Sequence, residues 1–193
     1  MTRTSIVIDA AAASAVIIVL SLVVAGYGTV LGWTATNNNF TTFENSKFGL
    51  KIQSPVKWAK EITDDPDLGQ DVTFLVPGSP IKFAEKVSIM VNANQTGPLN
   101  EIVRNMISFN NNENNALRNY KVIESVPTTL NGLNAHKLVT TYTDPKFKVV
   151  NSMQVIALKG DKLYEILYTS DPAKYHTLLP IVQQMIESFQ FIG

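Results

Sequence analysis

The sequence predicts an α+β protein in which a central antiparallel β-sheet is flanked by α-helices and preceded by one transmembrane α-helix. Three observations lead to this prediction. Residues 10–33 form a run without a charged side chain. Several later segments alternate apolar and polar residues, which is the period of a half-buried strand, and two others place apolar residues at helical spacing. Helices that pack on an antiparallel sheet make an α+β domain.

The uncharged run is long enough to cross a membrane. A helix over residues 10–33 would extend about 36 Å, and the hydrocarbon core of a bilayer is ~30 Å thick. A cleavable signal peptide has a shorter apolar region of ~7–15 residues and a small-x-small cleavage site. This run instead ends at the bulky Trp33. We therefore predict an uncleaved anchor over residues 10–33, preceded by a short cytoplasmic N-terminus of residues 1–9.

The flanking charges predict the orientation of this anchor. Arg3 precedes the run, and no Lys or Arg follows it until Lys47. The positive-inside rule then places the N-terminus in the cytoplasm and residues 34–193 outside the cell membrane. Asn39 and Asn94 begin N-x-[ST] sequons. These candidate glycosylation sites agree with an outside location, although such short motifs are common by chance.

Small side chains line one face of the predicted anchor, namely Ser14, Ser21, Ala25, Gly28 and Gly32. Small residues let a second helix approach closely, so this face is a candidate helix-packing surface toward other integral membrane subunits. The alternative is that Gly and Ser are simply tolerated in a span. Asp9 is predicted at the inner headgroup level rather than as a buried functional acid.

Residues 34–39 are predicted as a linker and residues 40–193 as one extracytoplasmic domain, which is long enough for a single core. Strands are predicted at residues 48–54, 71–77, 86–92, 120–126, 135–143, 149–158 and 163–169. The last three read as a meander of antiparallel hairpins. Asn131-Gly132 supplies a turn that accepts positive φ.

Two helices are predicted between and after these strands. Pro98 opens the first, whose apolar residues run from Leu99 to Ile107. Asp171-Pro172 caps the second, and Pro180 is a candidate break inside it. The Asn-rich run 110–115 is predicted as a loop, because Asn side chains compete for the backbone hydrogen bonds of a helix.

Three stretches of the sequence, taken in order, resemble PsbP-like proteins. They are Phe-Glu-Asn-x-x-Phe-Gly-Leu-Lys-Ile-Gln-x-Pro-x-x-Trp at 43–58, Leu-Asn-Gly-Leu-Asn-Ala-His-Lys-Leu-Val at 130–139, and Lys-Gly-Asp-Lys-Leu-Tyr-Glu-Ile-Leu-Tyr at 159–168 followed by Tyr175, Leu179-Pro180 and 185–189. The resemblance covers residues 43–191. It implies a Mog1/PsbP-like fold, with a central antiparallel sheet flanked by helices.

Members of this family are mostly extrinsic, non-catalytic proteins, and the plant member caps the lumenal side of photosystem II. The resemblance therefore implies an accessory or stabilising subunit that packs on the outer face of a larger membrane complex. Anchored versions of archaeal type, including those of ammonia oxidisers, are similar, so a copper-dependent membrane monooxygenase is one host by analogy alone. No metal-binding or partner-binding residue is carried over, because no such motif matches position by position.

Composition excludes several kinds of chemistry. Cysteine is absent, which excludes disulfides, thiolate metal sites and cysteine nucleophiles. Sixteen basic residues balance sixteen acidic ones, so the chain lacks the basic footprint of a nucleic-acid binder. His136 is predicted as a half-exposed structural residue and His176 as a surface residue. The acidic stretch Asp64–Asp71 is predicted as a solvated turn rather than a calcium site. We expect no enzymatic activity, catalytic residue, cofactor or metal site.

An anchored module that binds a small ligand or metal ion is the alternative to the accessory subunit. A deep pocket lined by Tyr142, Tyr164 or Tyr168 would favour it. An enzyme is a weaker third hypothesis, because no nucleophile–base pair is visible in the sequence.

Overall fold

The computed structural model describes residues 39–65, 69–79, 85–112, 117–144 and 149–193. The predicted anchor at 10–33, with its small residues Ser14, Ser21, Ala25, Gly28 and Gly32, lies outside the described residues. Within the described ranges, neither helix has the length and hydrophobicity that crossing a bilayer requires. Residues Asn39–Gly193 form one compact unit.

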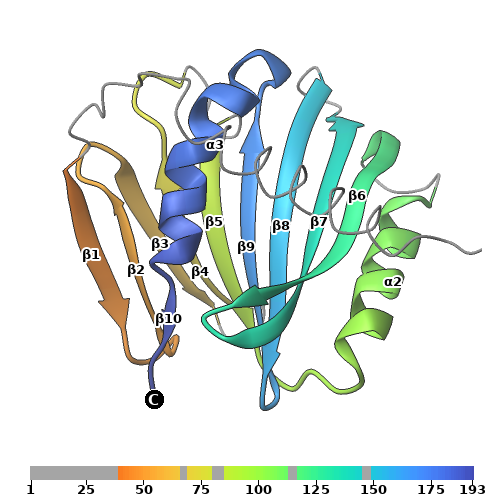
Figure 1. The fold of residues 1–193 in the computed structure, drawn as a ribbon, viewed down its shortest axis with the longest axis horizontal. Helices are drawn as coiled ribbons and strands as arrows, with labels where there is room; N and C mark the ends of the chain where they lie inside the picture. Colours follow the sequence, from red (N-terminus) through yellow and green to blue (C-terminus); the bar gives the residue numbers. More distant parts are fainter. Residues whose placement is uncertain (1–38, 66–68, 80–84, 113–116, 145–148) are drawn as a thin grey trace, which may run out of the picture. The chain divides into compact units, whose positions relative to one another are not determined.

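Two antiparallel sheets and two helices make up this unit (Figure 1). The strands are β1 (Phe40–Asn45), β2 (Leu50–Pro55), β3 (Ala59–Asp65), β4 (Gly69–Leu75), β5 (Lys86–Asn92), β6 (Arg118–Leu130), β7 (Leu133–Thr143), β8 (Val149–Lys159), β9 (Lys162–Ser170) and β10 (Gln190–Phe191). The helices are α2 (Leu99–Asn110) and α3 (Pro172–Glu187). The larger sheet has the order β3-β4-β5-β9-β8-β7-β6, and the smaller has the order β1-β2-β10.

The predicted meander is confirmed and is longer than expected, because it begins at β6 and runs through β9. Each strand pairs with the next one in the chain. The β6–β7 turn is Asn131-Gly132, with φ of 45° and 80°. Two consecutive positive φ values define a type I′ turn, whose twist matches that of the flanking strands. The turn predicted from the sequence is therefore confirmed.

The two helices cover opposite faces of the larger sheet, because neighbouring strand residues point to opposite sides. Val155 and Ile166 belong to the main core, on which α3 packs through Val182 and other residues. Ile156, next to Val155 on β8, instead packs with Val103 of α2. Figure 1 shows α3 lying across the sheet and α2 near the β6 edge. The expectation of helices flanking a sheet is confirmed.

The small sheet was not predicted from the sequence. Of the six residues of β1, only Phe43 is buried, so the strand has no apolar run. β10 has two residues and pairs with β2, more than 130 positions earlier in the chain. This pairing brings the rings of Phe189 and Phe191 against Tyr164, with centroids 6.2 and 4.9 Å away. The core therefore lies between the two sheets and α3, rather than under one sheet alone.

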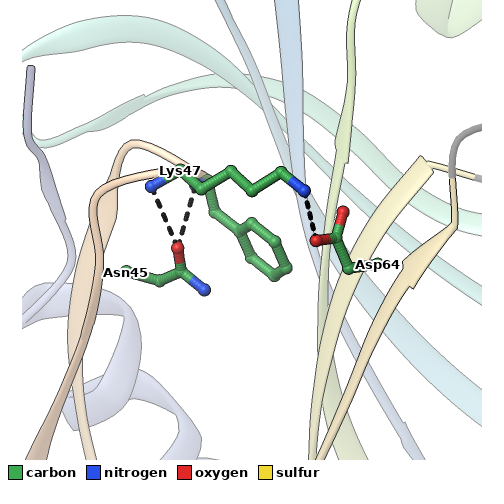
Figure 2. A network of polar contacts seen from close by, with 4 residues as sticks. Asn45, Lys47 and Asp64 are labelled. Carbon is green, nitrogen blue, oxygen red and sulfur yellow. Dashed lines mark hydrogen bonds and ion pairs between the residues drawn. The ribbon is translucent and has the colours of Figure 1, made fainter.

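The acidic stretch at 64–71 does not form the expected solvated turn over its whole length. Asp64 belongs to β3, and Asp71 belongs to β4. The Asp64 carboxylate pairs with the Lys47 ammonium, as Figure 2 shows. Asn45 Oδ1 accepts hydrogen bonds from the N–H groups of Lys47 and Phe48, at 3.0 and 3.2 Å. The turn after β1 is thereby linked to β3 in the other sheet.

The ends of the helices follow the sequence signals, but the predicted break does not occur. The Asp171 side chain accepts a hydrogen bond from the Ala173 N–H at 2.8 Å and caps α3. Near this cap, Lys174 forms an ion pair with the buried Glu85 at 2.9 Å. Pro180 lies inside α3, which continues through it. An internal Pro costs ~3 kcal/mol, and burial of apolar side chains such as Val182, two residues further along, offsets that cost.

Candidate functional site

An open groove of about 530 Å³ lies between α3 and strands β6, β7 and β8. Its floor consists of side chains from the sheet: Glu124, Thr128, Thr129, Lys137, Val139, Met153 and Val155. Its wall consists of side chains from α3: Tyr175, His176, Leu179, Gln183, Ile186 and Glu187. The lining combines apolar side chains with polar and charged ones, which is the usual composition of a binding surface.

The strand and helix periods explain why these side chains meet. Lys137 and Val139 are two residues apart on β7, so both point to the α3 face of the sheet. Tyr175, Leu179 and Gln183 recur every four residues on α3 and therefore share one side of the helix. We name this surface the α3 groove and keep the term below.

One ion pair lies on the floor of the α3 groove. The ammonium of Lys137 is 2.8 Å from Oε1 of Glu124, and the two side chains are 33% and 41% exposed. A pair this open to water contributes about 0–1 kcal/mol to stability. Its main effect is to place a hydrogen-bond donor and an acceptor beside the apolar side chains of the groove. A polar group of a bound molecule would form hydrogen bonds with these two side chains in place of their own contact.

An aromatic stack forms one end of the groove. The ring of Tyr175 stacks on that of Tyr168 at 5.1 Å, and the Tyr168 hydroxyl donates to the Tyr175 carbonyl at 2.9 Å. The His176 ring meets Tyr175 edge-on at 5.3 Å. Burial, and then the negative charge of Glu124, raise the pKa of Tyr175. Tyr175 is therefore neutral near pH 7 and offers a rigid aromatic surface rather than a base.

The β6–β7 hairpin lies close to the other end of α3. Asn131 Oδ1, at the hairpin turn, accepts a hydrogen bond from the Phe191 N–H of β10 at 3.1 Å. Leu130 is buried in the main core. Figure 1 shows the hairpin curving toward β10. Because β10 directly follows α3, this contact fixes the spacing between the helix and strand β6, which carries Thr128 and Thr129.

The two histidines do not come together. His136 lies on β7 on the face opposite the groove, half-buried, with Nε2 2.8 Å from Ser125 Oγ. His176 is exposed on α3 and lines the groove. In the part of the chain that the structure describes, no three His, Asp or Glu side chains are grouped so as to hold a metal ion.

Burial raises the pKa of Asp71, and the Asp71 carboxylate accepts a hydrogen bond from Thr73 Oγ1 at 2.9 Å.

The tyrosines expected in a ligand pocket lie elsewhere. Tyr164 and Tyr168 are buried in the main core. Tyr142 points to the other face of the sheet, where burial, Asp144 and Tyr120 raise its pKa to about 12. The α3 groove is lined by Tyr175 and by none of these three tyrosines, so the observation that would have favoured the ligand-binding alternative is not made at them. The four-residue spacing of α3 is a signal in the sequence that would have found Tyr175.

The sequon residues Asn39 and Asn94 are both exposed. Asn39 directly precedes β1, and its carbonyl accepts a hydrogen bond from the Val56 N–H at 2.8 Å. Asn94 has a φ of 59° after β5. Exposure meets one requirement for glycosylation, and the modification itself stays a prediction.

The two antiparallel sheets, the helices on opposite faces and the groove define a Mog1/PsbP-like domain. Domains of this fold are generally non-enzymatic accessory or binding domains. The chain belongs to the PsbP family, whose family model matches residues 38–191. The resemblance noted in the sequence is thus confirmed for the domain.

Solved structures with this fold come from distant organisms. Cyanobacterial PsbP (CyanoP) from Synechocystis sp. PCC 6803 is 14% identical, with a TM-score of 0.60 over 82% of this chain and 95% of that chain. LpqN of Mycobacterium tuberculosis, involved in cell envelope biogenesis, is 12% identical, with a TM-score of 0.53 over 80% and 91%. The Ran-binding protein Mog1p of Saccharomyces cerevisiae is 9% identical, with a TM-score of 0.52 over 80% and 96%. No curated protein sequence matches. These identities establish a shared fold alone.

Proposed function

We propose that this protein is a non-catalytic accessory subunit that packs on the outer face of a larger membrane protein complex. The segment at 10–33 anchors it, with the N-terminus in the cytoplasm and the PsbP-family domain outside. The observation that carries this proposal is the combination, in one chain, of a PsbP-family domain and a preceding apolar run long enough to span a bilayer.

The α3 groove is the surface of the domain that we assign to the partner. It combines apolar side chains with the Lys137–Glu124 ion pair, so a partner would bury apolar area beside groups that form hydrogen bonds. Interfaces of this composition are typical of complexes whose members also exist apart. The small residues of the anchor would supply a second contact inside the membrane.

Purification in a mild detergent, followed by mass spectrometry of the co-purifying chains, tests the proposal. We expect integral membrane proteins in stoichiometric amounts, and a membrane monooxygenase is one host to look for. Recovery of the protein alone, at its monomer mass, would contradict the proposal. So would release of a form trimmed after Trp33 into the medium.

Two pairs of variants separate the contacts. Replacing Gly28 and Gly32 with Leu fills the small-residue face, whereas Ala12→Leu introduces a Leu side chain about 160° away from Gly28 on an ideal helix. Leu179→Lys places a charge in the groove. Ile62→Lys places one on the exposed surface of β3, where Ile62 is 50% exposed. We expect only the first member of each pair to reduce co-purification.

A second candidate function, a module that retains a small ligand, is favoured by the size of the groove. About 530 Å³ falls in the range of ~300–1,000 Å³ in which small-molecule sites occur. The lining predicts an apolar ligand with one polar end near the Lys137–Glu124 pair. Native mass spectrometry of the purified protein would show a bound molecule, and Val155→Trp, which fills the floor, would remove it.

A further inference from the structure

A buried carboxyl group lies on the sheet face opposite the α3 groove. Glu165 of β9 is 7% exposed, although Glu is rarely buried without a partner. Its neighbours directly across the sheet are the apolar Met90 of β5 and Ile156 of β8. Ile156 packs with Val103 of α2, as does Leu163, which lies two residues before Glu165 on the same face. Glu165 is therefore next to the patch on which α2 sits.

The hydrogen bonds around Glu165 are incomplete for an ionised group. Gln154 of β8 donates from Nε2 to Glu165 Oε1 at 2.9 Å. The other end of the same amide, Gln154 Oε1, is buried and finds no donor among the described residues. Burying a carboxylate that has a single neutral donor and no cation is strongly unfavourable. A neutral carboxyl group has an O–H, which is the donor that Gln154 Oε1 lacks.

The charged groups around this site do not compensate a carboxylate. On the same face, His136 lies opposite Ile156, two strands from Glu165, and contacts Ser125. Lys86, at the start of β5, interacts electrostatically with Asp71 of β4. Burial raises the pKa of Tyr120 of β6, and the charge of Glu165 adds to the rise. The charged side chains of α2 are Glu101 and Arg104, and both are exposed.

We propose that Glu165 and Gln154 form a protonated acid–amide pair that acts as a pH-sensitive latch for α2. In the closed form, the Glu165 O–H donates to Gln154 Oε1 while Gln154 Nε2 donates to Glu165. When the proton leaves to solvent, the O–H donor is lost and a negative charge appears beside the Ile156–Leu163 patch. The packing of α2 on that patch is then weakened, because the charge gains hydration if the helix moves away.

The direction of the pH effect follows from burial. Burial raises the pKa of Glu165 to about 7, against the opposing effect of the Gln154 hydrogen bond. The ordinary value is 4.5, so between pH 4.5 and 7 the folded state retains a proton that the unfolded state has lost. Stability therefore falls as pH rises through this window. The folding equilibrium constant decreases by up to about tenfold for each pH unit.

Hydrogen exchange of the full-length protein in detergent micelles tests the latch. The protection of the α2 amides, corrected for intrinsic exchange, is measured from pH 5.5 to 8.5. We expect protection in the wild type to fall as pH rises from 5.5 to 7 and to level off above pH 7. In Glu165→Gln, which keeps a neutral amide in place of the acid, we expect protection to stay level over the whole range. Glu101→Gln removes an exposed carboxylate from α2 and should behave like the wild type. An equal pH response in the wild type and Glu165→Gln would overturn the proposal.

A measurement on the wild type covers the case in which Glu165→Gln fails to fold. Infrared spectra of protein labelled with ¹³C-carboxyl glutamate report protonated side chains directly. We expect one protonated glutamate at pH 6 that titrates near pH 7. If every glutamate is ionised at pH 6, the acid–amide pair does not exist. The outcome is independent of whether the protein has a membrane partner.

Discussion

Replacing Gly49 with Ala would test how closely the small sheet approaches the rest of the core. Gly49 precedes β2 and has a φ of 71°, a conformation that favours glycine. A Cβ at this position would lie 2.8 Å from the Tyr164 hydroxyl oxygen and 3.2 Å from the Ile192 carbonyl oxygen. The Gly49 carbonyl also accepts a hydrogen bond from the Ile192 N–H at 3.0 Å. The methyl group would therefore separate the chain after β10 from β2.

Two effects set the magnitude of the loss. The left-handed conformation costs an L-residue about 1–2 kcal/mol relative to glycine. Forcing an extra methyl group into a packed site costs about 1–3 kcal/mol more. In the unfolded state, a chain with Ala at position 49 has less conformational entropy than a chain with Gly, and this difference stabilises the folded variant by about 0.4–1 kcal/mol. We expect a net decrease of about 1–5 kcal/mol in the free energy of unfolding.

Gly160→Ala is the matched control. Gly160 has a φ of 63°, but a Cβ there meets no described atom within 4 Å. It therefore carries the backbone cost alone, which we expect to be about 1 kcal/mol. Urea unfolding of both variants, followed by circular dichroism, gives the two values under the same conditions. Their difference measures the steric contribution at Gly49.

A double variant identifies the obstructing atom. Tyr164→Phe removes the hydroxyl oxygen at 2.8 Å but leaves the Ile192 carbonyl in place. Combined with Gly49→Ala, it should recover part of the loss, so the two changes are not additive. If Gly49→Ala costs no more than Gly160→Ala, or if the double variant shows full additivity, the close approach inferred here is wrong.

Three further substitutions test the contacts that hold α3. Tyr168→Phe removes the buried hydroxyl that donates to the Tyr175 carbonyl, and urea unfolding should show a loss of about 1–2 kcal/mol. Asp171→Ala removes the N-cap and should cost about 1 kcal/mol, whereas Asp171→Asn keeps the cap and most of the stability. Lys174→Met leaves the Glu85 carboxylate, 3% exposed, without its cation. We expect about 1–2 kcal/mol there, because Lys174 itself is half-exposed. A change below about 0.5 kcal/mol would contradict the contact concerned.

Local sequence patterns predicted most of the large sheet and both helices. The predicted strand at 86–92 coincides with β5, and that at 149–158 differs from β8 by one residue. Asp171-Pro172 and Asn131-Gly132 gave the start of α3 and the β6–β7 turn. Periodicity, capping and turn chemistry act over a few residues, so they can be read from the sequence alone.

Features stabilised by distant partners were missed. β3 is rich in charged residues and is a strand because it pairs with β4 at the edge of the sheet. β1 and β10 owe their conformation to β2. Pro180 was expected to interrupt α3, yet the helix continues because side chains on both sides of it are buried. In each case tertiary packing outweighs the local preference.

The sequence by itself determined the class of the domain, the order of its main elements and the absence of cysteine chemistry, because these depend on composition and short-range periodicity. The resemblance to the family came from three stretches of the sequence taken in order. Only the tertiary structure decided that α3 and strands β6–β8 enclose a groove and that Tyr175, rather than Tyr142, lines it. It alone placed Gln154 beside the buried Glu165. Which side chains meet across a sheet depends on strand order and register, and both are set by contacts between residues far apart in the chain.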